Sequence, residues 1–246
     1  MLKLFKIKKN LLINRLDWDS NFFMLEVGEV DFSAAENLDI KAIHAQALQQ
    51  KLDLIYLRSP REIAYQAGEI DLQLVDRKVT YTTDISTLTT TSTATNIIIS
   101  PKKEVPENDL IELSILAGNY SRFKMDKKIE QQKFVELYTL WMTNSINRRF
   151  ADEVFVYQAA KKANGMITVK IKNDFADIGL ISVHEKMQGK GVGRKLIEAV
   201  INWLKQEKEI SRLNVVTQID NINACRFYEK MGFVELKREF IYHLRT

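Results

Sequence analysis

The sequence has little material for covalent or metal cross-links. Among its 246 residues there is one cysteine, Cys225, which excludes an intramolecular disulfide. The three histidines, His44, His184 and His243, are scattered, and no pair has the spacing of zinc ligands. We therefore expect no metal. The lone cysteine agrees with a reducing environment, so we expect a cytoplasmic location.

Long apolar runs are also missing. No apolar stretch approaches the roughly 20 residues that a helix needs to span a bilayer. Residues 1–10 interleave Lys with Leu, Phe and Ile, which is a poor signal peptide. The net charge of +4 is too small to indicate a nucleic-acid-binding protein, although a mild basic excess suits an anionic ligand. We expect neither a membrane span nor a nucleic-acid partner.

What the chain does contain is ordinary globular material, with 46% hydrophobic and 28% charged residues, enough for a sizeable core. Residues 86–96 are dominated by Thr and Ser, and Pro101 and Pro106 follow. We place a domain boundary there, between a smaller α/β domain of residues 1–95 and a larger domain of residues 96–246. Because Thr-rich stretches also form strands, the cut is soft.

Hydrophobic periodicity predicts the elements of both domains. Before the boundary we expect a helix over residues 39–50 and strands over 54–57, 72–75 and 78–83, the last two separated by Asp76 and Arg77. After it we expect helices over 107–117 and 133–146, strands over 153–159, 165–171 and 177–183, a helix over 192–205, a strand over 213–217, a helix over 221–230, and one strand or a strand pair over 234–244. Residues 160–164, ending in Asn-Gly, predict a hairpin connection. The three consecutive strands over residues 153–159, 165–171 and 177–183 predict an antiparallel meander.

A glycine-rich segment follows a strand and opens a helix. Its sequence is Gln188-Gly189-Lys190-Gly191-Val192-Gly193-Arg194. Glycines let backbone N–H groups approach a ligand closely, and the helix start adds unpaired N–H groups and the positive end of the helix dipole. These features suit a pyrophosphate. The spacing matches neither the dinucleotide-binding nor the Walker pattern.

A second motif lies further along the chain. Asn221, Ala224 and Tyr228 fall at i, i+3 and i+7 and so share one face of a helix. An amide, a small residue and a phenol together are unusual for packing alone. They suit a helix face that contacts a ligand.

The pattern Gln188-x-x-Gly191-x-Gly193 with a later Asn-x-x-Ala-x-x-x-Tyr-x-x-x-Gly-Phe resembles the GNAT superfamily of N-acetyltransferases. The resemblance implies the GNAT fold, an α/β fold with a mixed, mostly antiparallel central sheet flanked by helices, and it implies acetyl-CoA as co-substrate. It implies that the backbone of Ile181, Ser182 and Val183 pairs with the pantetheine arm. It also implies that the pyrophosphate and the remainder of the coenzyme are bound by Gln188, Gly189, Lys190, Gly191, Val192, Gly193, Arg194, Asn221, Ala224 and Phe227.

The resemblance makes Tyr228 the general acid. An amine attacks the thioester, and a thiolate of pKa near 8.5 leaves. A tyrosine with a pKa near 10 is protonated at neutral pH and can donate to that sulfur. The alternative for Tyr228 is an ordinary half-buried helix tyrosine. The general base stays open between Asp177, His184 and a water relay.

Four further segments narrow the resemblance. They are Trp18-Asp19-Ser20-Asn21-Phe22-Phe23, Ser121-Arg122-Phe123-x-x-Asp126, Leu137-Tyr138-x-x-Trp141-x-x-x-Ser145 and Tyr242-His243-Leu244. They are similar to the dTDP-fucosamine acetyltransferases, which acetylate the 4-amine of dTDP-4-amino-4,6-dideoxy-D-galactose. The similarity implies a small-molecule nucleotide-sugar acceptor and a role in cell-surface polysaccharide synthesis. Met24 departs from the group, which has glycine there.

A nucleotide sugar is anionic and carries an aromatic base, so Arg122 and Phe123 are candidates to bind it. The other predicted acceptor residues are Trp18, Asp19, Phe23 and Asp126. Their alternatives are core packing for the aromatic residues and turn capping for the aspartates. Other acceptors stay open, namely a protein N-terminus, a polyamine or an antibiotic, as does a non-catalytic acyl-CoA-binding module. The oligomeric state is also open, a homodimer being one option.

Overall fold

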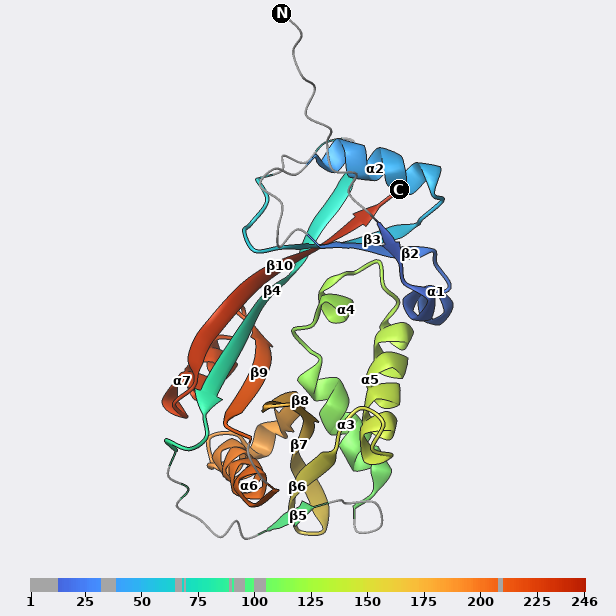
Figure 1. The fold of residues 1–246 in the computed structure, drawn as a ribbon. Coiled ribbons are helices and arrows are strands. Elements are labelled where there is room, and N and C mark those ends of the chain that lie inside the picture. The colour runs from blue at the N-terminus through green and yellow to red at the C-terminus, as the bar shows by residue number, and fades with distance from the viewer. Residues whose placement is uncertain are drawn as a thin grey trace, which may run out of the picture. The chain divides into compact units, whose positions relative to one another are not determined.

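The computed structural model describes residues 13–31, 39–64, 68, 70–88, 90, 96–99, 105–207 and 210–246 (Figure 1). The chain divides into two compact units. Unit 1 combines the residues up to Val75 with Glu239–Thr246, and unit 2 runs from Asp76 to Arg238. The predicted boundary at residue 95 falls at residues 91–95, outside the described residues, so the division into functional domains stays a prediction.

Unit 1 is a small sheet with a helix on it. Its strand order is β1 (Asn14–Arg15), β2 (Val27–Asp31), β3 (Leu54–Ser59) and the C-terminal part of β10 (Val234–Arg245). β2 and β3 are parallel, while β10 runs antiparallel to β3. Helix α2 (Ile40–Gln49) begins at Asp39, whose side chain accepts a hydrogen bond from the backbone N–H of Ala42, and it buries Ile43 and Ala47. The helix predicted over 39–50 is confirmed.

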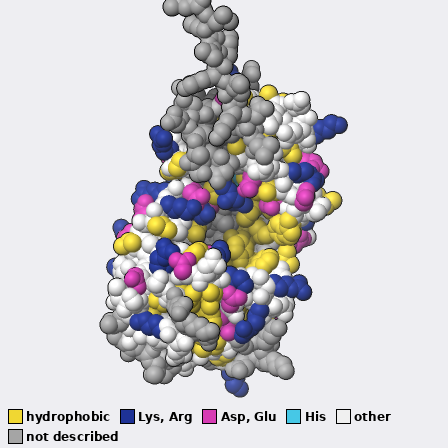
Figure 2. All heavy atoms as spheres, in the orientation of Figure 1, with side chains coloured by type: hydrophobic (Ala, Val, Ile, Leu, Met, Phe, Trp, Pro, Cys, Tyr) yellow, Lys and Arg dark blue, Asp and Glu magenta, His cyan; other side chains and the backbone are white. Residues whose placement is uncertain are grey.

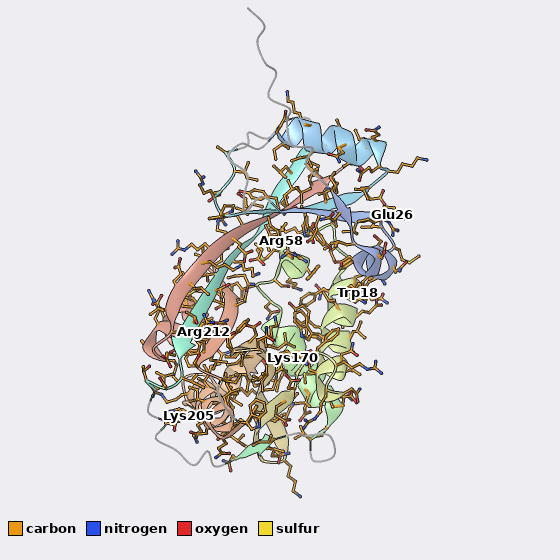
Figure 3. The ribbon with its side chains drawn as sticks, in the orientation of Figure 1. Trp18, Glu26, Arg58, Lys170, Lys205 and Arg212 are labelled. Atoms are coloured by element: carbon orange, nitrogen blue, oxygen red, sulfur yellow. The ribbon has the colours of Figure 1, made fainter. Side chains whose placement is uncertain are left out.

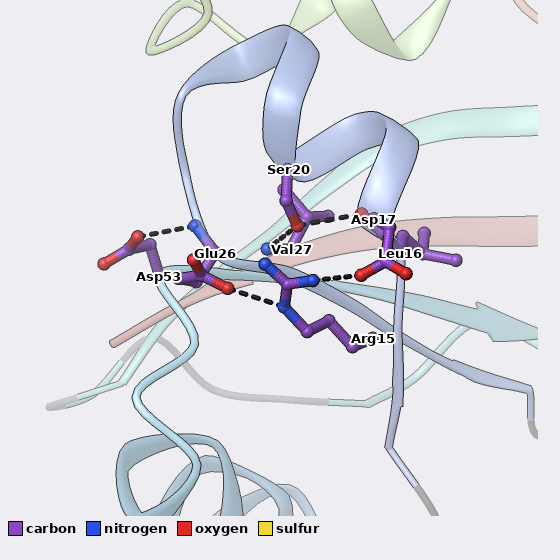
Figure 4. Close-up of polar contacts among 7 residues, drawn as sticks. All are labelled: Arg15, Leu16, Asp17, Ser20, Glu26, Val27 and Asp53. Atoms are coloured by element: carbon purple, nitrogen blue, oxygen red, sulfur yellow. Dashed lines mark hydrogen bonds and ion pairs between the residues drawn. The ribbon is translucent and has the colours of Figure 1, made fainter.

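Helix α1 (Asp17–Phe23) is fixed to β2 by Ser20. The Ser20 hydroxyl donates to the Leu16 carbonyl at 2.8 Å and accepts from the Val27 N–H at 3.0 Å (Figure 4). Arg15 pairs with Glu26 at 2.7 Å and also with Asp17. Ser20 in the Trp18–Phe23 motif is therefore a structural residue.

The end of α1 explains the departure at Met24. Met24 has φ 56° and ψ 39°, in the left-handed region where glycine is favoured. Its side chain is 80% exposed, so packing gives little in return. The position is a helix C-terminus that requires the conformation for which glycine is best suited.

Unit 2 contains most of the sheet. Its strand order is the N-terminal part of β10, β4 (Asp71–Asp84), β9 (Arg212–Gln218), β8 (Phe175–Val183), β7 (Lys162–Lys172), β6 (Glu153–Ala159) and β5 (Ile97–Ile99). The antiparallel meander predicted for β6, β7 and β8 is confirmed. β4 and β10 each contribute residues to both units. The predicted break at Asp76 and Arg77 is wrong, because β4 continues through both residues.

Helices cover both faces of the unit 2 sheet. Ser182 on β8 donates to the Leu113 carbonyl of α3 (Glu107–Ala117) at 2.7 Å, while its neighbours Ile181 and Val183 pack in the cluster of α6 (Val192–Glu207) and α7 (Ile222–Lys230). Successive strand side chains point to opposite faces, so α3 lies on one face and α6 on the other. Helix α5 (Gln131–Ile146) packs on α3, with the Ser114 hydroxyl 2.9 Å from the Tyr138 carbonyl oxygen.

The turn between β6 and β7 differs from the expectation. The hairpin turn is formed by Ala160 and Lys161, whose φ values of 53° and 61° are both positive, as a two-residue type I′ turn requires. The Asn-Gly pair instead lies inside β7, where Tyr157 faces Gly165 and Gln158 faces Ala163, leaving Asn164 as an inserted residue. The Asn164 amide donates to the Ala159 carbonyl at 3.0 Å. The Asn-Gly signal therefore marks a β-bulge.

On the face that Figure 2 shows, the Lys and Arg side chains of the described residues are interspersed with Asp and Glu. Among the described helices, none combines the length with the apolar character that crossing a bilayer requires.

Candidate active site

Two neighbouring parallel strands separate part-way along their length. β8 and β9 pair from Phe175 opposite Arg212 to Ile178 opposite Val215. Both strands continue beyond that point, β8 to Val183 and β9 to Gln218, and the described ladder between them does not. The remaining stretch of β8 thus offers backbone N–H and C=O groups to an extended ligand.

A bulge in β8 accompanies this separation. Val169 on β7 faces Ile178, whereas Ile167 faces Ile181, so Gly179 and Leu180 together oppose Thr168. The Leu180 N–H donates to the Thr168 hydroxyl at 2.8 Å, and a Cβ at Gly179 would lie 2.9 Å from the same oxygen. The bulge bends β8 away from β9 and leaves the predicted pantetheine residues, Ile181, Ser182 and Val183, after the bend.

The glycine-rich loop follows the separated end of β8. Gly189 and Gly191 have φ values of 72° and 79°, and a Cβ at either would meet nothing within 4 Å. These glycines are therefore required by backbone conformation and not by lack of space. The Gln188 side-chain amide donates to the Val183 carbonyl at 3.0 Å, which ties the loop to β8. α6 starts at Val192, so its unpaired N–H groups lie within the loop.

The two sequence motifs meet at Gly193. A Cβ there would lie 3.1 Å from Cζ of Phe227, so the Phe227 ring packs directly on the first turn of α6. Lys190 and Arg194 lie on the same segment and are exposed, Arg194 with its guanidinium 3.8 Å from Glu198. A pyrophosphate at this helix start would meet backbone donors and two cationic side chains.

Asn221 has a structural role in addition to the predicted one. It is the N-cap of α7, and its side-chain oxygen accepts from the Ala224 N–H at 3.2 Å. Such a cap stabilises a helix by about 1 kcal/mol. Asn221 caps α7, the half-buried Ala224 and Phe227 lie on it, and Phe227 makes the contact with Gly193.

Tyr228 is 3% exposed and surrounded by aromatic rings. Its ring centroid lies 5.9 Å from that of Tyr81, 5.4 Å from Phe227 and 5.8 Å from Phe233. Burial raises the pKa of Tyr228 above its usual value, with Cys225 adding to the effect. The phenol therefore holds its proton at neutral pH, which a general acid for a leaving thiolate requires.

Tyr81 on β4 was not among the predicted residues. Its hydroxyl donates to the Glu229 carboxylate at 3.0 Å, and burial followed by this hydrogen bond raises the pKa of Tyr81. It is a second protonated phenol next to Tyr228. Its place in the site arises from pairing between β4 and β9, which no local motif reveals.

The predicted acceptor residues fall in both units. In unit 2, helix α4 (Arg122–Met125) places the Arg122 guanidinium 4.6 Å from the centroid of Phe123. Asp126, 1% exposed, ends α4 and accepts from the Lys128 N–H at 2.9 Å, so it has the capping role that was its alternative. The acceptor-binding assignment of all three stays a prediction.

The unit 1 candidates lie on α1. Trp18 is 50% exposed and stacks on Phe22 at 5.0 Å between ring centroids (Figure 3). Phe23 is buried, and Asp19 accepts from the Tyr56 hydroxyl at 3.2 Å. Trp18 thus presents an exposed aromatic surface, whereas Phe23 has the core position that was its alternative.

The two proposed bases both have structural partners. Asp177 pairs with Lys172 at 2.8 Å, and Nδ1 of His184 accepts from the Lys186 N–H at 3.3 Å. A third carboxyl, Asp76 on β4, is buried, and burial raises its pKa to about 7. The sequence shows Asp76 as a charged residue between two apolar runs, a pattern that predicts a strand break and not a buried carboxyl. Among the described residues, no group of three or more His, Cys, Asp and Glu side chains is placed to hold a metal.

Residues 120–233 match a model of the acetyltransferase (GNAT) family. The matched segment contains α4, α5, the bulged β8, the glycine-rich loop and α7. The matched segment thus includes all of the predicted coenzyme-binding residues, which run from Ile181 to Phe227.

The names of the chain's relatives come from different settings. N-alpha-acetyltransferase 30 of Saccharomyces cerevisiae is 34% identical over 67 residues, which are 27% of this chain and 38% of the yeast protein. The spore coat polysaccharide biosynthesis protein SpsD of Bacillus subtilis is 23% identical over 146 residues, which are 59% of this chain and 50% of SpsD. The chain therefore matches half or less of the length of these relatives.

A solved structure extends the likeness in fold. A conserved protein of unknown function from Staphylococcus epidermidis ATCC 12228 superposes with a TM-score of 0.62, covering 98% of this chain and 92% of that chain at 13% identity. At this identity the likeness concerns the fold alone. It agrees with the mixed α/β class, a large sheet flanked by helices.

Proposed function

We propose that this chain is an acetyl-CoA-dependent N-acetyltransferase that acetylates the amine of a nucleotide-linked amino sugar. The observation that carries the donor half is the separation of β8 from β9 beside the glycine-rich start of α6. That arrangement presents strand backbone to an extended arm and helix N–H groups to a phosphate within one segment.

The donor is bound as follows. Backbone groups of Ile181, Ser182 and Val183 pair with the pantetheine arm. N–H groups from Gly189 to Gly193 bind the pyrophosphate, with Lys190 and Arg194 supplying positive charge. Gln188 holds the loop against β8 through its bond to Val183.

Tyr228 completes the reaction. The neutral amine attacks the thioester carbonyl, the tetrahedral intermediate collapses with cleavage of the C–S bond, and Tyr228 gives its proton to the thiolate. The raised pKa of Tyr228 keeps the phenol protonated at neutral pH, so a proton is available at the departing sulfur, and solvent then returns a proton to the tyrosine. The nitrogen loses one proton to solvent as the amide forms. This proton offsets the one that Tyr228 gives to the thiolate.

The acceptor half rests on different support. The relationship to SpsD, whose name places it in polysaccharide synthesis, agrees with the four segments shared with the dTDP-fucosamine acetyltransferases. Arg122 beside Phe123 supplies a cation and a ring for a nucleotide. The proposal includes a cytoplasmic location, where nucleotide sugars are made.

A protein N-terminus is the second candidate acceptor, favoured by the 34% identity to the yeast N-alpha-acetyltransferase. A thiol-release assay separates the two. The purified chain receives acetyl-CoA with dTDP-4-amino-4,6-dideoxy-D-galactose, its C4 epimer, or a panel of peptides with free N-termini. Acceptor-dependent thiol release with a sugar nucleotide supports the proposal. Release with peptides alone transfers the function to protein N-acetylation, and acetyl-CoA binding without any release indicates a non-catalytic module.

A further inference from the structure

A polar group is buried in unit 2 on the sheet face opposite to Tyr228. Along the unbroken strand β4, Val79 and Tyr81 pack in the cluster of α6 and α7. Because side chains alternate along a strand, Asp76 and Thr80 point to the other face. That is the face covered by α3 and α5.

Asp76 and Thr80 are 8% and 6% exposed. Oδ1 of Asp76 and Oγ1 of Thr80 have no hydrogen-bond partner among the described residues. A buried carboxyl oxygen without a donor destabilises a fold, so its presence requires an explanation. A ligand that supplies the donor is such an explanation, and unfilled hydrogen-bonding capacity is typical of a binding site.

The surroundings of Asp76 define which ligand group suits it. The Arg122 charge from α4 and the Lys78 charge from β4 act on the carboxyl, the Gln218 side chain hydrogen-bonds to it, and Asp220 lies near it. Tyr138 of α5 and Ser121 complete the group. Arg122 and Lys78 already place two positive charges near the Asp76 carboxyl, so a cationic ligand group is disfavoured there. The group that donates to Oδ1 is therefore a neutral hydroxyl or N–H group.

Asp76 lies too far from Tyr228 to take part in the acetyl transfer itself. Tyr81 contacts Tyr228, and Asp76 is five residues from Tyr81 along an extended strand, or about 17 Å. Lys78 faces Gln218, which places Asp76 beyond the last residue of β9, at the end of the sheet where β8 and β9 are separated. An acceptor that reaches both residues is extended and polar at its far end.

We propose that Asp76 is a specificity residue for the acceptor, whose remote hydroxyl or N–H group donates a hydrogen bond to Oδ1. This inference rests on the proposed function, since it requires an extended acceptor. The raised pKa of Asp76, about 7, supports it: binding of a donor favours the ionised form, so the acceptor KM should rise as the pH falls below 7. Arg122, Lys78, Gln218, Asp220 and Tyr138 are the groups that share this environment.

The test compares Asp76→Ala and Asp76→Asn with Asp84→Asn, an exposed aspartate at the end of the same strand. The acceptor is dTDP-4-amino-4,6-dideoxy-D-galactose. We expect Asp76→Ala to raise the acceptor KM about 10- to 100-fold, as loss of a hydrogen bond to a charged group predicts. The kcat at saturating acceptor and the KM for acetyl-CoA should stay within about twofold of the wild type, and Asp84→Asn should match the wild type in all three.

The outcomes are distinguishable. An unchanged acceptor KM in Asp76→Ala, or a loss confined to kcat, overturns the role of Asp76 and leaves the proposed function intact. No thiol release by the wild-type chain with any sugar nucleotide overturns both. Acceptors that lack single hydroxyl groups identify the donor, because the wild type and Asp76→Ala should have equal KM values for the analogue without it.

Discussion

Replacing Asp76 by asparagine should remove a pH dependence from the stability of the chain. Burial raises the pKa of Asp76 from 3.8 to about 7. The folded state therefore holds the proton more tightly than the unfolded state does. Stability from this group is complete below pH 3.8 and is lost as the pH rises towards 7.

The size of the effect follows from the difference in pKa. About three pKa units at 1.36 kcal/mol each give a loss of about 4 kcal/mol once the pH exceeds 7. Roughly 2 to 3 kcal/mol of this loss develops between pH 5 and pH 8. The asparagine side chain cannot ionise and keeps nearly the same shape as aspartate, so the variant escapes this loss.

Urea unfolding of both proteins at pH 5, 6, 7 and 8 measures the difference in free energy of unfolding. We expect Asp76→Asn to gain stability relative to the wild type steadily up to about pH 7, where the difference levels off. Asp84→Asn is the control, because hydrogen bonds from Ser86 lower the pKa of Asp84 and its contribution is constant above pH 5. A difference between the two proteins that stays constant from pH 5 to pH 8 would refute the reasoning and would indicate that the carboxylate of Asp76 is purely structural.

Three other substitutions test the site and the fold. Tyr228→Phe removes the phenolic proton and keeps the ring, so kcat should fall about 100- to 1,000-fold while the Kd of acetyl-CoA, measured by calorimetry, is unchanged; full activity would remove the acid role. Gly191→Ala places a Cβ at φ 79°, which strains the loop by about 1–2 kcal/mol, and should weaken acetyl-CoA binding; an unaltered Kd argues against pyrophosphate binding by this backbone. Met24→Gly should raise the free energy of unfolding by up to about 1 kcal/mol, because φ 56° then carries no side-chain penalty; a lower value in urea titration would show that the Met24 side chain stabilises unit 1.

The sequence predicts the elements whose signal is local. The apolar stripe at helical spacing through Phe134, Leu137, Tyr138, Trp141 and Met142 predicts α5 correctly, and all of these side chains are buried except Trp141, which is half-buried. The glycine-rich loop and the α7 motif lie where they were predicted because the first depends on positive φ values and the second on a helix cap. A local rule also explains Met24. It stands where the resembling group has glycine, and its backbone has the left-handed conformation that glycine adopts most easily.

The remainder depends on residues that are distant in the sequence. Asp76 looks like a break because a charged pair inside an apolar run usually marks a turn, yet pairing with β9 keeps the strand continuous. Its neighbours Arg122 and Gln218 come from elements that sequence spacing does not relate. The Asn-Gly pair misleads for the opposite reason, because the same residues serve a turn or a bulge, and only the register with β6 decides between them.

The order of the unit 1 strands along the chain affects how unit 1 folds during translation. β3 pairs with β2 on one side and with the Phe240–Arg245 part of β10 on the other, and its central residues are fully buried. This part of β10 is translated after all of unit 2, so β3 is paired on one side only until then. Until then one edge of β3, with Leu54, Ile55 and Leu57, is open to pairing with other chains. A fragment that stops at Val75 should therefore aggregate, and adding residues 239–246 as a separate peptide should restore its solubility.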